Sequence, residues 1–182
     1  MRKYPTNYKP NLYLGDDKIR FYLGNQGECT LFCLSINPST ANDVNSDPTM
    51  NSLLNIAKSK GFDGCIMINS APFRSNTPQK LPKEPNIEII KQNIEEIEKL
   101  FEKFPNNTML CAWGNYYLTG PAWFKESLKD IVDRAKKHNI RLVCVSKNKS
   151  GQPAHISYLN RDHKFFDFGN GEYELIDYEP FL

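Results

Sequence analysis

Polar side chains that could bind or cleave a small molecule gather in four short segments of the chain. They are Asn37-Pro38-Ser39-Thr40, then Asn69 with Arg74 beyond it, then Trp113-Gly114-Asn115, and last the stretch SKNKSGQPAHISY with Lys147, Lys149 and His155. Each segment follows an apolar run that predicts a buried strand. The carboxyl ends of parallel strands lie at one edge of a sheet, where α/β proteins bind ligands. We therefore expect the four segments to converge on one site.

Each of these residues also has a purely structural interpretation. Pro38 restricts Asn37 to an extended conformation and can simply end the strand, and Gly114 can serve only to turn the backbone tightly. The remaining alternatives are loop hydrogen bonds for Ser39, Thr40, Asn69 and His155, a core position for Trp113, and exposed charges for Arg74, Lys147 and Lys149. His138 and His163 are expected on the surface. Sequence alone leaves the functional and structural interpretations open.

The hydrophobic pattern predicts both strands and helices. Strands are expected at 18–24, 30–36, 64–69, 108–114 and 141–146, which are rich in apolar and β-forming residues. Helices are expected over about 48–60, 87–104 and 121–139, where apolar residues recur every three or four positions. Asp47 suits the N-cap of the first helix, with a catalytic acid as the alternative interpretation. The loop that it ends is expected to line the pocket.

Alternation of buried strands with amphipathic helices predicts an α/β fold. We expect a three-layer sandwich in which helices cover both faces of a central, mostly parallel sheet, with β extensions at the N-terminal and C-terminal ends. Residues 161–182 are expected to form a β-hairpin tail that turns at Gly169-Asn170-Gly171. The whole chain, 1–182, is predicted to be one domain with its core at about 28–160.

The composition is that of an ordinary globular protein. The chain has 182 residues, of which 40% are hydrophobic, and its net charge of +2 permits a phosphate-bearing ligand without requiring one. Five cysteines without a CxxC pair, and three scattered histidines, predict no metal site, and no cofactor is expected. Thiols in apolar runs, no signal peptide and no apolar run of about 20 residues favour a cytoplasmic protein without a membrane span.

The ordered motifs NPSTAND, DPT, GFDGCIMINSAPFRSNTPQKL, CAWGNYY and SGQPAHISYL closely resemble a bacterial and phage family known as domain of unknown function 1643. The resemblance covers residues 31–159, which is most of the chain. The family usually has His-Pro-Leu-Tyr where this chain has His155-Ile156-Ser157-Tyr158, so the proline of that loop is missing here. Tyr158, in this last motif, is a further candidate substrate-binding residue. Membership of the family assigns no activity by itself.

A more distant resemblance, to the uracil-DNA glycosylase superfamily, rests on five short motifs in the same order. They are Ser35-Ile36-Asn37-Pro38, Ser52-Leu53-Leu54-Asn55, Ile66-Met67-Ile68-Asn69, Cys111-Ala112-Trp113-Gly114 and His155-Ile156-Ser157. In that superfamily the first motif positions a water and the asparagine of the third recognises the base. The last is a His-Pro-Ser loop, which this chain matches in part. The resemblance implies a fold like that of the uracil-DNA glycosylases.

The same resemblance implies roles for individual residues. Asn69 would recognise the edge of a nucleobase, Asn37 would hold a water below the sugar carbon, and His155 would stabilise charge on the departing base. Phe73 is the candidate for stacking on the base, and Arg74, Lys147 and Lys149 are candidates for phosphate contacts. An amide does not accept a proton near neutral pH, so Asn37 can only orient the water.

The sequence therefore predicts an N-glycosidic hydrolase that recognises a nucleobase in a nucleic acid or nucleotide. The alternative is a non-catalytic nucleotide or nucleobase binding protein with the same pocket, favoured by the amide at Asn37 and by the missing proline after His155. A third hypothesis is an interaction domain with an empty cleft. Both of the first two require that Asn37, Asn69, Trp113 and His155 surround a single cavity. DNA, a nucleotide or a nucleobase is the expected partner.

Overall fold

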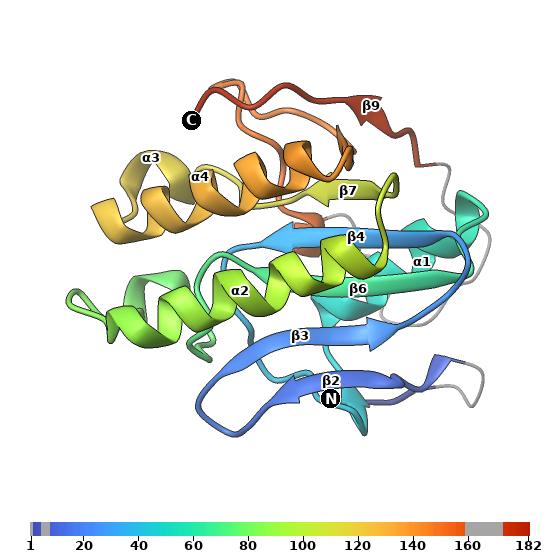
Figure 1. Ribbon diagram of the computed structural model, residues 1–182, viewed down its shortest axis with the longest axis horizontal. Coiled ribbons are helices and arrows are strands. Elements are labelled where there is room, and N and C mark those ends of the chain that lie inside the picture. The colour runs from blue at the N-terminus through green and yellow to red at the C-terminus, as the bar shows by residue number, and fades with distance from the viewer. Residues whose placement is uncertain (1, 5–7, 159–172) are drawn as a thin grey trace.

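A mixed seven-stranded sheet is the centre of the molecule (Figure 1). The computed structural model describes residues 2–4, 8–158 and 173–182. In spatial order the strands are β2 (Leu12–Gly15), β3 (Arg20–Asn25), β6 (Gly64–Asn69), β4 (Thr30–Ser35), β7 (Thr108–Cys111), β8 (Arg141–Cys144) and β9 (Ile176–Asp177). A separate two-stranded sheet pairs β1 (Arg2–Lys3) with β5 (Asn45–Ser46).

The four central strands, β6, β4, β7 and β8, run parallel to one another. The outer strands β2, β3 and β9 are antiparallel, so three of the six pairings in the sheet are antiparallel. The predicted α/β class is confirmed, while the sheet as a whole is mixed rather than mostly parallel. The reason is that the N-terminal and C-terminal strands join the parallel strands in a single sheet.

Four α-helices accompany the sheet among the described residues. They are α1 (Pro48–Ser59), α2 (Ile87–Lys103), α3 (Tyr116–Thr119) and α4 (Ala122–Lys137), with 3-10 turns at η2 (Pro78–Lys80) and η3 (Ile156–Tyr158). The three long helices lie where the apolar periodicity predicted them. The single-turn α3 has too few residues for such a periodicity to reveal it.

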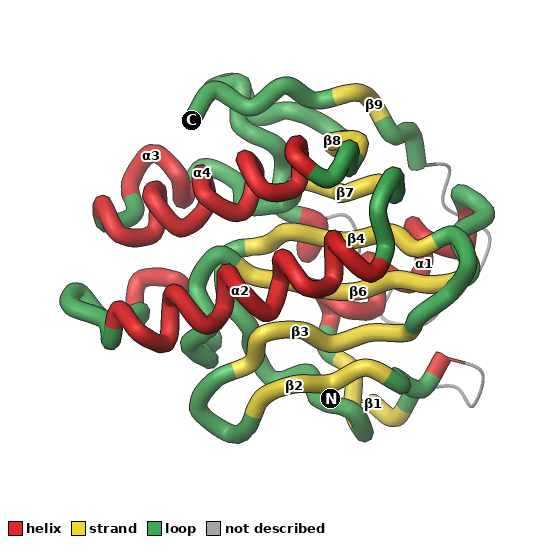
Figure 2. Tube along the Cα trace, viewed as in Figure 1, coloured by secondary structure: helices red, strands yellow, loops and turns green. Residues whose placement is uncertain are grey.

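Helices cover both faces of the sheet, because successive side chains of a strand point to opposite sides. Phe32 and Ile66 pack with residues of α2 and α4, whereas Cys33 and Met67 pack with residues of α1. Figures 1 and 2 show α2 and α4 together on one side of the sheet and α1 on the other. Since β4 and β6 are covered on both sides, every residue in them is buried, which explains their unbroken apolar sequences.

The strands β3 and β4 are consecutive in the chain but do not pair, because β6 lies between them. The connecting residues 26–29 cross the start of β6 instead of forming a hairpin. There the carboxylate of Asp63 accepts hydrogen bonds from the backbone N–H groups of Glu28 (3.1 Å) and Cys29 (2.8 Å). This contact anchors the crossing. The antiparallel pairing of β3 with β6 then leaves the start of β3 beside the carboxyl end of β6.

The connections between the parallel strands diverge at the centre of the sheet. From β4 the chain passes through α1 on one face to reach β6, and from β6 it returns through α2 on the other face to reach β7. From β7 the chain continues through α4, on the face opposite α1, so the segments that leave β4 and β7 diverge at the carboxyl ends of these two strands. Such a switch point is where open α/β sheets bind their ligands.

The C-terminal segment contributes β9, which pairs antiparallel with β8, and Tyr178, whose ring packs against Trp113 with centroids 5.8 Å apart. The predicted turn at Gly169-Asn170-Gly171 lies outside the described residues, as does His163. The described residues of the tail therefore extend the sheet and close the core beside β7.

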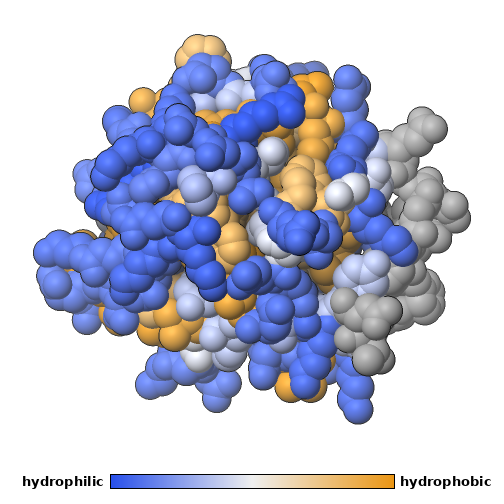
Figure 3. Space-filling model, turned by 45° about the vertical axis from the view of Figure 1, so that its right-hand side comes forward, coloured by the Kyte–Doolittle hydropathy of each residue, from blue (hydrophilic) through white to orange (hydrophobic). Residues whose placement is uncertain are grey.

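The surface and the thiols agree with the composition. On the face shown in Figure 3, hydrophilic residues surround and interrupt the apolar patches. Among the described residues no helix combines the length and apolar character needed to traverse a bilayer. Cys33, Cys65, Cys111 and Cys144 are free and buried, and burial raises the pKa of the Cys65 thiol to about 12. These four thiols are core side chains, as their apolar surroundings predicted.

Replacing Phe101 with Ala should lower the free energy of unfolding by about 3–5 kcal/mol. Its ring is fully buried and meets Phe32 edge-on, with centroids 5.2 Å apart, so truncation leaves a cavity between α2 and the sheet. Urea denaturation followed by circular dichroism measures the change. Gln92→Ala, at an exposed position of the same helix, is the control and should shift stability by less than about 0.5 kcal/mol. Equal effects of the two changes would contradict this packing.

Candidate functional site

Two adjoining hollows lie at the carboxyl ends of β4, β6 and β7. The first, the cavity, has a volume of about 30 Å³ and is lined by Arg20, Ser35, Asn37, Ser39, Asp47, Thr49, Met50, Met67, Asn69 and His155. The second, the groove, is open to solvent, has a volume of about 630 Å³, and shares Asn37, Ser39, Asp47, Thr49 and His155 with the cavity. Its other lining residues include Thr40, Trp113, Gly114, Asn115 and Tyr116. The cavity therefore lies against the inner wall of the groove.

Asn69 lies at the end of β6, directly beside Ser35 of β4 in the strand register. Its side chain is 1% exposed, and its Oδ1 accepts a hydrogen bond of 3.0 Å from Arg20. A guanidinium group only donates, so this contact fixes the orientation of the amide. On the other side of the strand, Asn93 of α2 donates to the backbone carbonyl of Asn69 (2.9 Å). The amide nitrogen is thus the group that Asn69 can offer to a ligand in the cavity.

Arg20, at the start of β3, is buried beneath the site. It donates to Asn69 and, at 3.1 Å, to the carbonyl of Ala41, while its Nε has no hydrogen-bond partner among the described residues. Burial lowers the pKa of the guanidinium to about 10, an effect that the nearby Asp47 partly opposes. Arg20 is therefore still a cation at neutral pH, and it places a buried positive charge on the wall of the cavity.

His155 precedes η3 and is held by two serines. The backbone N–H of Ser157 donates to His155 Nδ1 (3.2 Å), so Nδ1 is the acceptor in the neutral ring and Nε2 carries the proton. That Nε2 lies 2.9 Å from the hydroxyl oxygen of Ser35. Burial lowers the pKa of the ring to about 4, although Asp47 acts in the opposite direction. His155 is thus a neutral hydrogen-bond donor at pH 7.

Asn37 follows β4 and lines both hollows. Its Nδ2 donates to the backbone carbonyls of Pro38 (2.9 Å) and Ser75 (2.8 Å). Both amide protons are used in this way, so the acceptor Oδ1 is what the side chain can present to a ligand or a water. This is the geometry that a water-orienting amide needs.

Asp47 both caps α1 and lines the two hollows. Its Oδ1 accepts a hydrogen bond from the backbone N–H of Met50 (2.9 Å), which confirms the predicted N-cap, and its Oδ2 accepts one from Ala41 (3.1 Å). The side chain is buried, and it is the only carboxylate among the residues that line either hollow. A negative charge therefore lies beside Asn37 and His155.

The loop after β4 is cross-linked from outside by Arg74. Its guanidinium donates to the carbonyls of Asp16 (2.7 Å), Ser39 (2.7 Å) and Ala41 (3.0 Å) and to the hydroxyl of Tyr13 (3.3 Å). These contacts occupy the group that was expected to meet a phosphate. Pro38 is likewise structural, since it is buried and its carbonyl accepts from Ser75 (2.9 Å). Arg74 and Pro38 hold the loop, while Ser39 and Thr40 line the groove.

The segment after β7 forms the opposite wall of the groove. The Trp113 indole is fully buried and donates to Gln152 (2.8 Å), so its ring belongs to the core. Gly114 has a φ of +61°, a conformation that favours glycine. Asn115, on the rim, accepts hydrogen bonds from Asn148 (3.1 Å) and Ser150 (2.7 Å). The backbone therefore turns at Gly114 and brings Asn115 against the loop that leads to His155.

Phe73, Lys147 and Lys149 are absent from the lining of both hollows. Phe73 packs edge-on against Trp123, with centroids 6.2 Å apart, and belongs to the core margin rather than to the lining of either hollow. Tyr116, like Trp113, is an aromatic residue that lines the groove. Lys147 lies over the ring of Tyr178 and lines a separate surface depression, while Lys149 is exposed on the loop bonded to Asn115. Tyr158 ends η3, at the limit of the described segment.

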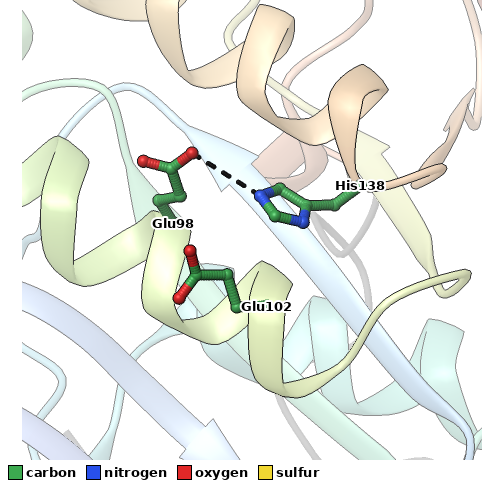
Figure 4. Close-up of side chains that lie close together, drawn as sticks. All are labelled: Glu98, Glu102 and His138. Carbon is green, nitrogen blue, oxygen red and sulfur yellow. Dashed lines mark ion pairs between the residues drawn. The ribbon is translucent and has the colours of Figure 1, made fainter.

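Away from the two hollows, a cluster of three titratable side chains lies between α2 and the end of α4 and has the spacing of metal ligands (Figure 4). Its members are Glu98, Glu102 and His138. The expectation that His138 is a surface residue is wrong, since its side chain is only 16% exposed. Glu98 also pairs with Arg134 and Lys137. Burial opposes its ionisation, but Arg134, His138 and Lys137 together hold its pKa below the usual value. Because Arg134 and Lys137 of α4 already pair with Glu98 of α2, the cluster serves as an ion-pair link between these two helices.

The described fold is that of an α/β protein with two hollows, lined mostly by polar residues, at the carboxyl edge of its sheet. The chain belongs to the family described as "Protein of unknown function (DUF1643)", whose model matches residues 20–155. No curated protein and no solved structure matches the chain. The family match ends at His155, so it includes the strands and loops that form the site.

Sequence reasoning did not single out Arg20 and Ser35. Arg20 carries a visible signal, because it is a lone charge inside the strand-forming stretch KIRFYLG. Ser35 carries none, since a serine at a strand end is common. Its position beside Asn69 and His155 follows only from the pairing of β4 with β6 and from the path of the last loop.

Replacing Arg20 with Met should lower the free energy of unfolding by about 3 kcal/mol, because two buried acceptors lose a charged donor. Chemical denaturation measures the loss. The matched control is Arg141→Met, which removes only an exposed ion pair with Asp177 and should cost less than about 1 kcal/mol. If Arg20→Met were as stable as the control, Arg20 would not hold the site together.

His155 should be neutral at pH 7 and titrate near pH 4, against an ordinary value of 6.5. Between these values the unfolded chain binds more protons than the folded one, so stability rises with pH across the window and falls as pH drops through it. The loss should reach about 3 kcal/mol at most. Ring proton shifts in NMR give the pKa, and His155→Gln should remove this part of the pH dependence. A ring that titrates near 6.5 would refute the buried environment.

Proposed function

We propose that the chain is an N-glycosidic hydrolase that recognises a nucleobase, with the three-layer arrangement of the uracil-DNA glycosylases. The observation that carries the proposal is the meeting of Asn37, Asn69 and His155 on one cavity at the switch point of the sheet. These are the residues to which the motif resemblance assigns water orientation, base recognition and charge stabilisation. A cytoplasmic location fits the buried free thiols.

Base recognition would depend on the fixed amide of Asn69. Because Arg20 occupies its Oδ1, Asn69 can act towards a ligand chiefly as a hydrogen-bond donor. A donor in a cavity of about 30 Å³ suits a single carbonyl oxygen at the edge of a base. The rest of the nucleoside would lie in the groove, whose volume of about 630 Å³ is within the range of small-molecule sites.

Departure of the base would be assisted by neutral donors. Negative charge develops on the base as its bond to the sugar breaks, and preorganised donors in a buried site stabilise such charge. Asn69 Nδ2 lines the cavity where this charge would arise. So does the hydroxyl of Ser35, whose oxygen accepts from the protonated Nε2 of His155 and whose own proton can be donated to the base. The positive charge of Arg20 behind Asn69 strengthens the same effect.

The groove favours a nucleoside unit over a phosphate-rich ligand. Apart from Asp47 and His155, its lining residues carry no ionisable acidic or basic group other than the Tyr116 phenol, and most are amides, hydroxyls or backbone. Phosphates of a nucleic acid would have to meet residues outside the groove, such as Lys149 on its rim loop. A free nucleoside and a nucleotide flipped out of DNA both satisfy this requirement.

A second candidate function is binding of a nucleotide or nucleobase without cleavage. The amide of Asn37 favours it, because an amide orients water but does not take its proton at neutral pH. The two functions share the cavity and differ only in whether the glycosidic bond breaks.

Incubation with nucleosides, and with oligonucleotides that contain uracil, hypoxanthine or hydroxymethyluracil, tests the proposal. We expect release of free base, or abasic sites that alkali cleaves. Binding without cleavage, seen as a rise in melting temperature with a nucleoside or nucleotide, would select the second function. If neither cleavage nor binding occurred across the panel, both would be wrong.

Asn69→Asp should reduce base release, or binding, by about a hundredfold. The substitution keeps the shape and the oxygen that faces Arg20, but it replaces the donor nitrogen with an acceptor. Asn69→Ala should have at least as large an effect. The control is Asn11→Asp, since Asn11 lies on the opposite margin of the sheet and lines neither hollow. Wild-type activity in Asn69→Asp would remove this residue from base recognition.

A further inference from the structure

We propose that Asp47 is the catalytic carboxylate that takes a proton from the attacking water, a role that rests on the proposed hydrolysis. The motif resemblance assigns the water-holding position to Asn37, which has no basic group. In the folded chain Asp47 and Asn37 line both the cavity and the groove. The carboxylate that Asn37 lacks is therefore supplied by a residue ten positions further along the chain.

Helix capping alone does not account for a buried carboxylate at this position. Asn and Ser cap helices as well as Asp does, and burying a charge carries a cost that a neutral cap avoids. Asp47 is only 6% exposed, and although the charge of Arg20 acts on it from nearby, no direct ion pair joins the two among the described residues. A buried carboxyl group next to a ligand-sized groove points to chemistry.

The hydrogen bonds of Asp47 leave room for a water. One oxygen accepts from the backbone N–H of Met50 and the other from that of Ala41, at 2.9 and 3.1 Å. An ionised carboxylate offers about four acceptor positions, so each oxygen retains one. The two backbone bonds, one from α1 and one from the preceding loop, fix the orientation of the group before a ligand arrives.

Asp47 and Asn37 then each accept a hydrogen bond from one water molecule. Asn37 uses both amide protons on backbone carbonyls, so its Oδ1 accepts one proton of the water. Asp47 accepts the other proton. With both protons held, a lone pair of the water oxygen is directed at the sugar carbon in the groove.

The chemical step balances without a cofactor. The water oxygen bonds to the anomeric carbon as the carbon–nitrogen bond breaks, and that electron pair leaves with the base. The water proton passes to the Asp47 carboxylate. The base anion, held by Asn69 and His155, takes up a proton from the solvent or from Asp47, and Asp47 returns to its ionised form.

Asp47→Asn and Asp47→Ser test the role, because both residues can still cap α1. We expect base release to slow by about a hundredfold or more in each, with nucleoside affinity unchanged. The melting temperature should fall modestly, because neither residue can replace both oxygens and the backbone N–H of Ala41 loses its acceptor. Single-turnover rates of base release, isothermal calorimetry with the same nucleoside, and thermal denaturation supply the three readouts. Asp43→Asn is the control, since Asp43 lies on the same loop but lines a separate depression, and it should keep the wild-type rate.

Several outcomes would overturn the role of Asp47. Wild-type rates in Asp47→Asn and Asp47→Ser would show that the carboxylate takes no proton. A loss of affinity equal to the loss of rate would make Asp47 a ligand contact instead. Rates are compared at a temperature where circular dichroism shows all variants folded, so a weakened cap does not imitate a catalytic defect. If the wild type binds a nucleoside but releases no base, the proposed hydrolysis is wrong. If the wild type releases base and the Asp47 variants release it equally fast, hydrolysis is supported and only the role of Asp47 is wrong.

Discussion

The site depends above all on the hydrogen bonds that the buried guanidinium of Arg20 donates. Arg20 connects three parts of the chain: β3, which carries it, the end of β6 through Asn69, and the loop after β4 through the carbonyl of Ala41. Burial of a guanidinium costs free energy unless its donors are paired. Loss of either hydrogen bond would leave a buried donor unpaired, so the folded chain favours conformations that keep both partners beside Arg20. The orientation of the Asn69 amide, and hence the kind of ligand atom that it can meet, follows from this one hydrogen bond.

The position of the site follows from the order of the strands. Because the chain leaves β4 through α1 on one face and leaves β7 through α4 on the other, the loops after these two strands separate and leave a groove between them. The in-register pairing of β4 with β6 then brings Ser35 beside Asn69. The last loop crosses this edge and adds His155, which Ser35 and Ser157 hold in one tautomer.

The charges and dipoles of the site restrict the kind of ligand more than the shape of the site does. A neutral imidazole, two oriented amides and one carboxylate surround the cavity, with a single cation behind them. Fixed dipoles of this kind act strongly where water is excluded. The groove itself offers amides and hydroxyls rather than cations, which matches an uncharged nucleoside unit better than a polyphosphate.

The sequence by itself determined the elements: the apolar run Leu31–Ile36 and the cap at Asp47 predicted a strand and a helix, because local periodicity and capping depend only on neighbouring residues. It also indicated which polar segments end the strands. Only the tertiary structure decided that β6 separates β3 from β4, that Arg74 holds a loop rather than a ligand, and that Arg20 lies under Asn69. Strand order and side-chain partners depend on contacts between residues far apart in the chain, and no local pattern encodes them.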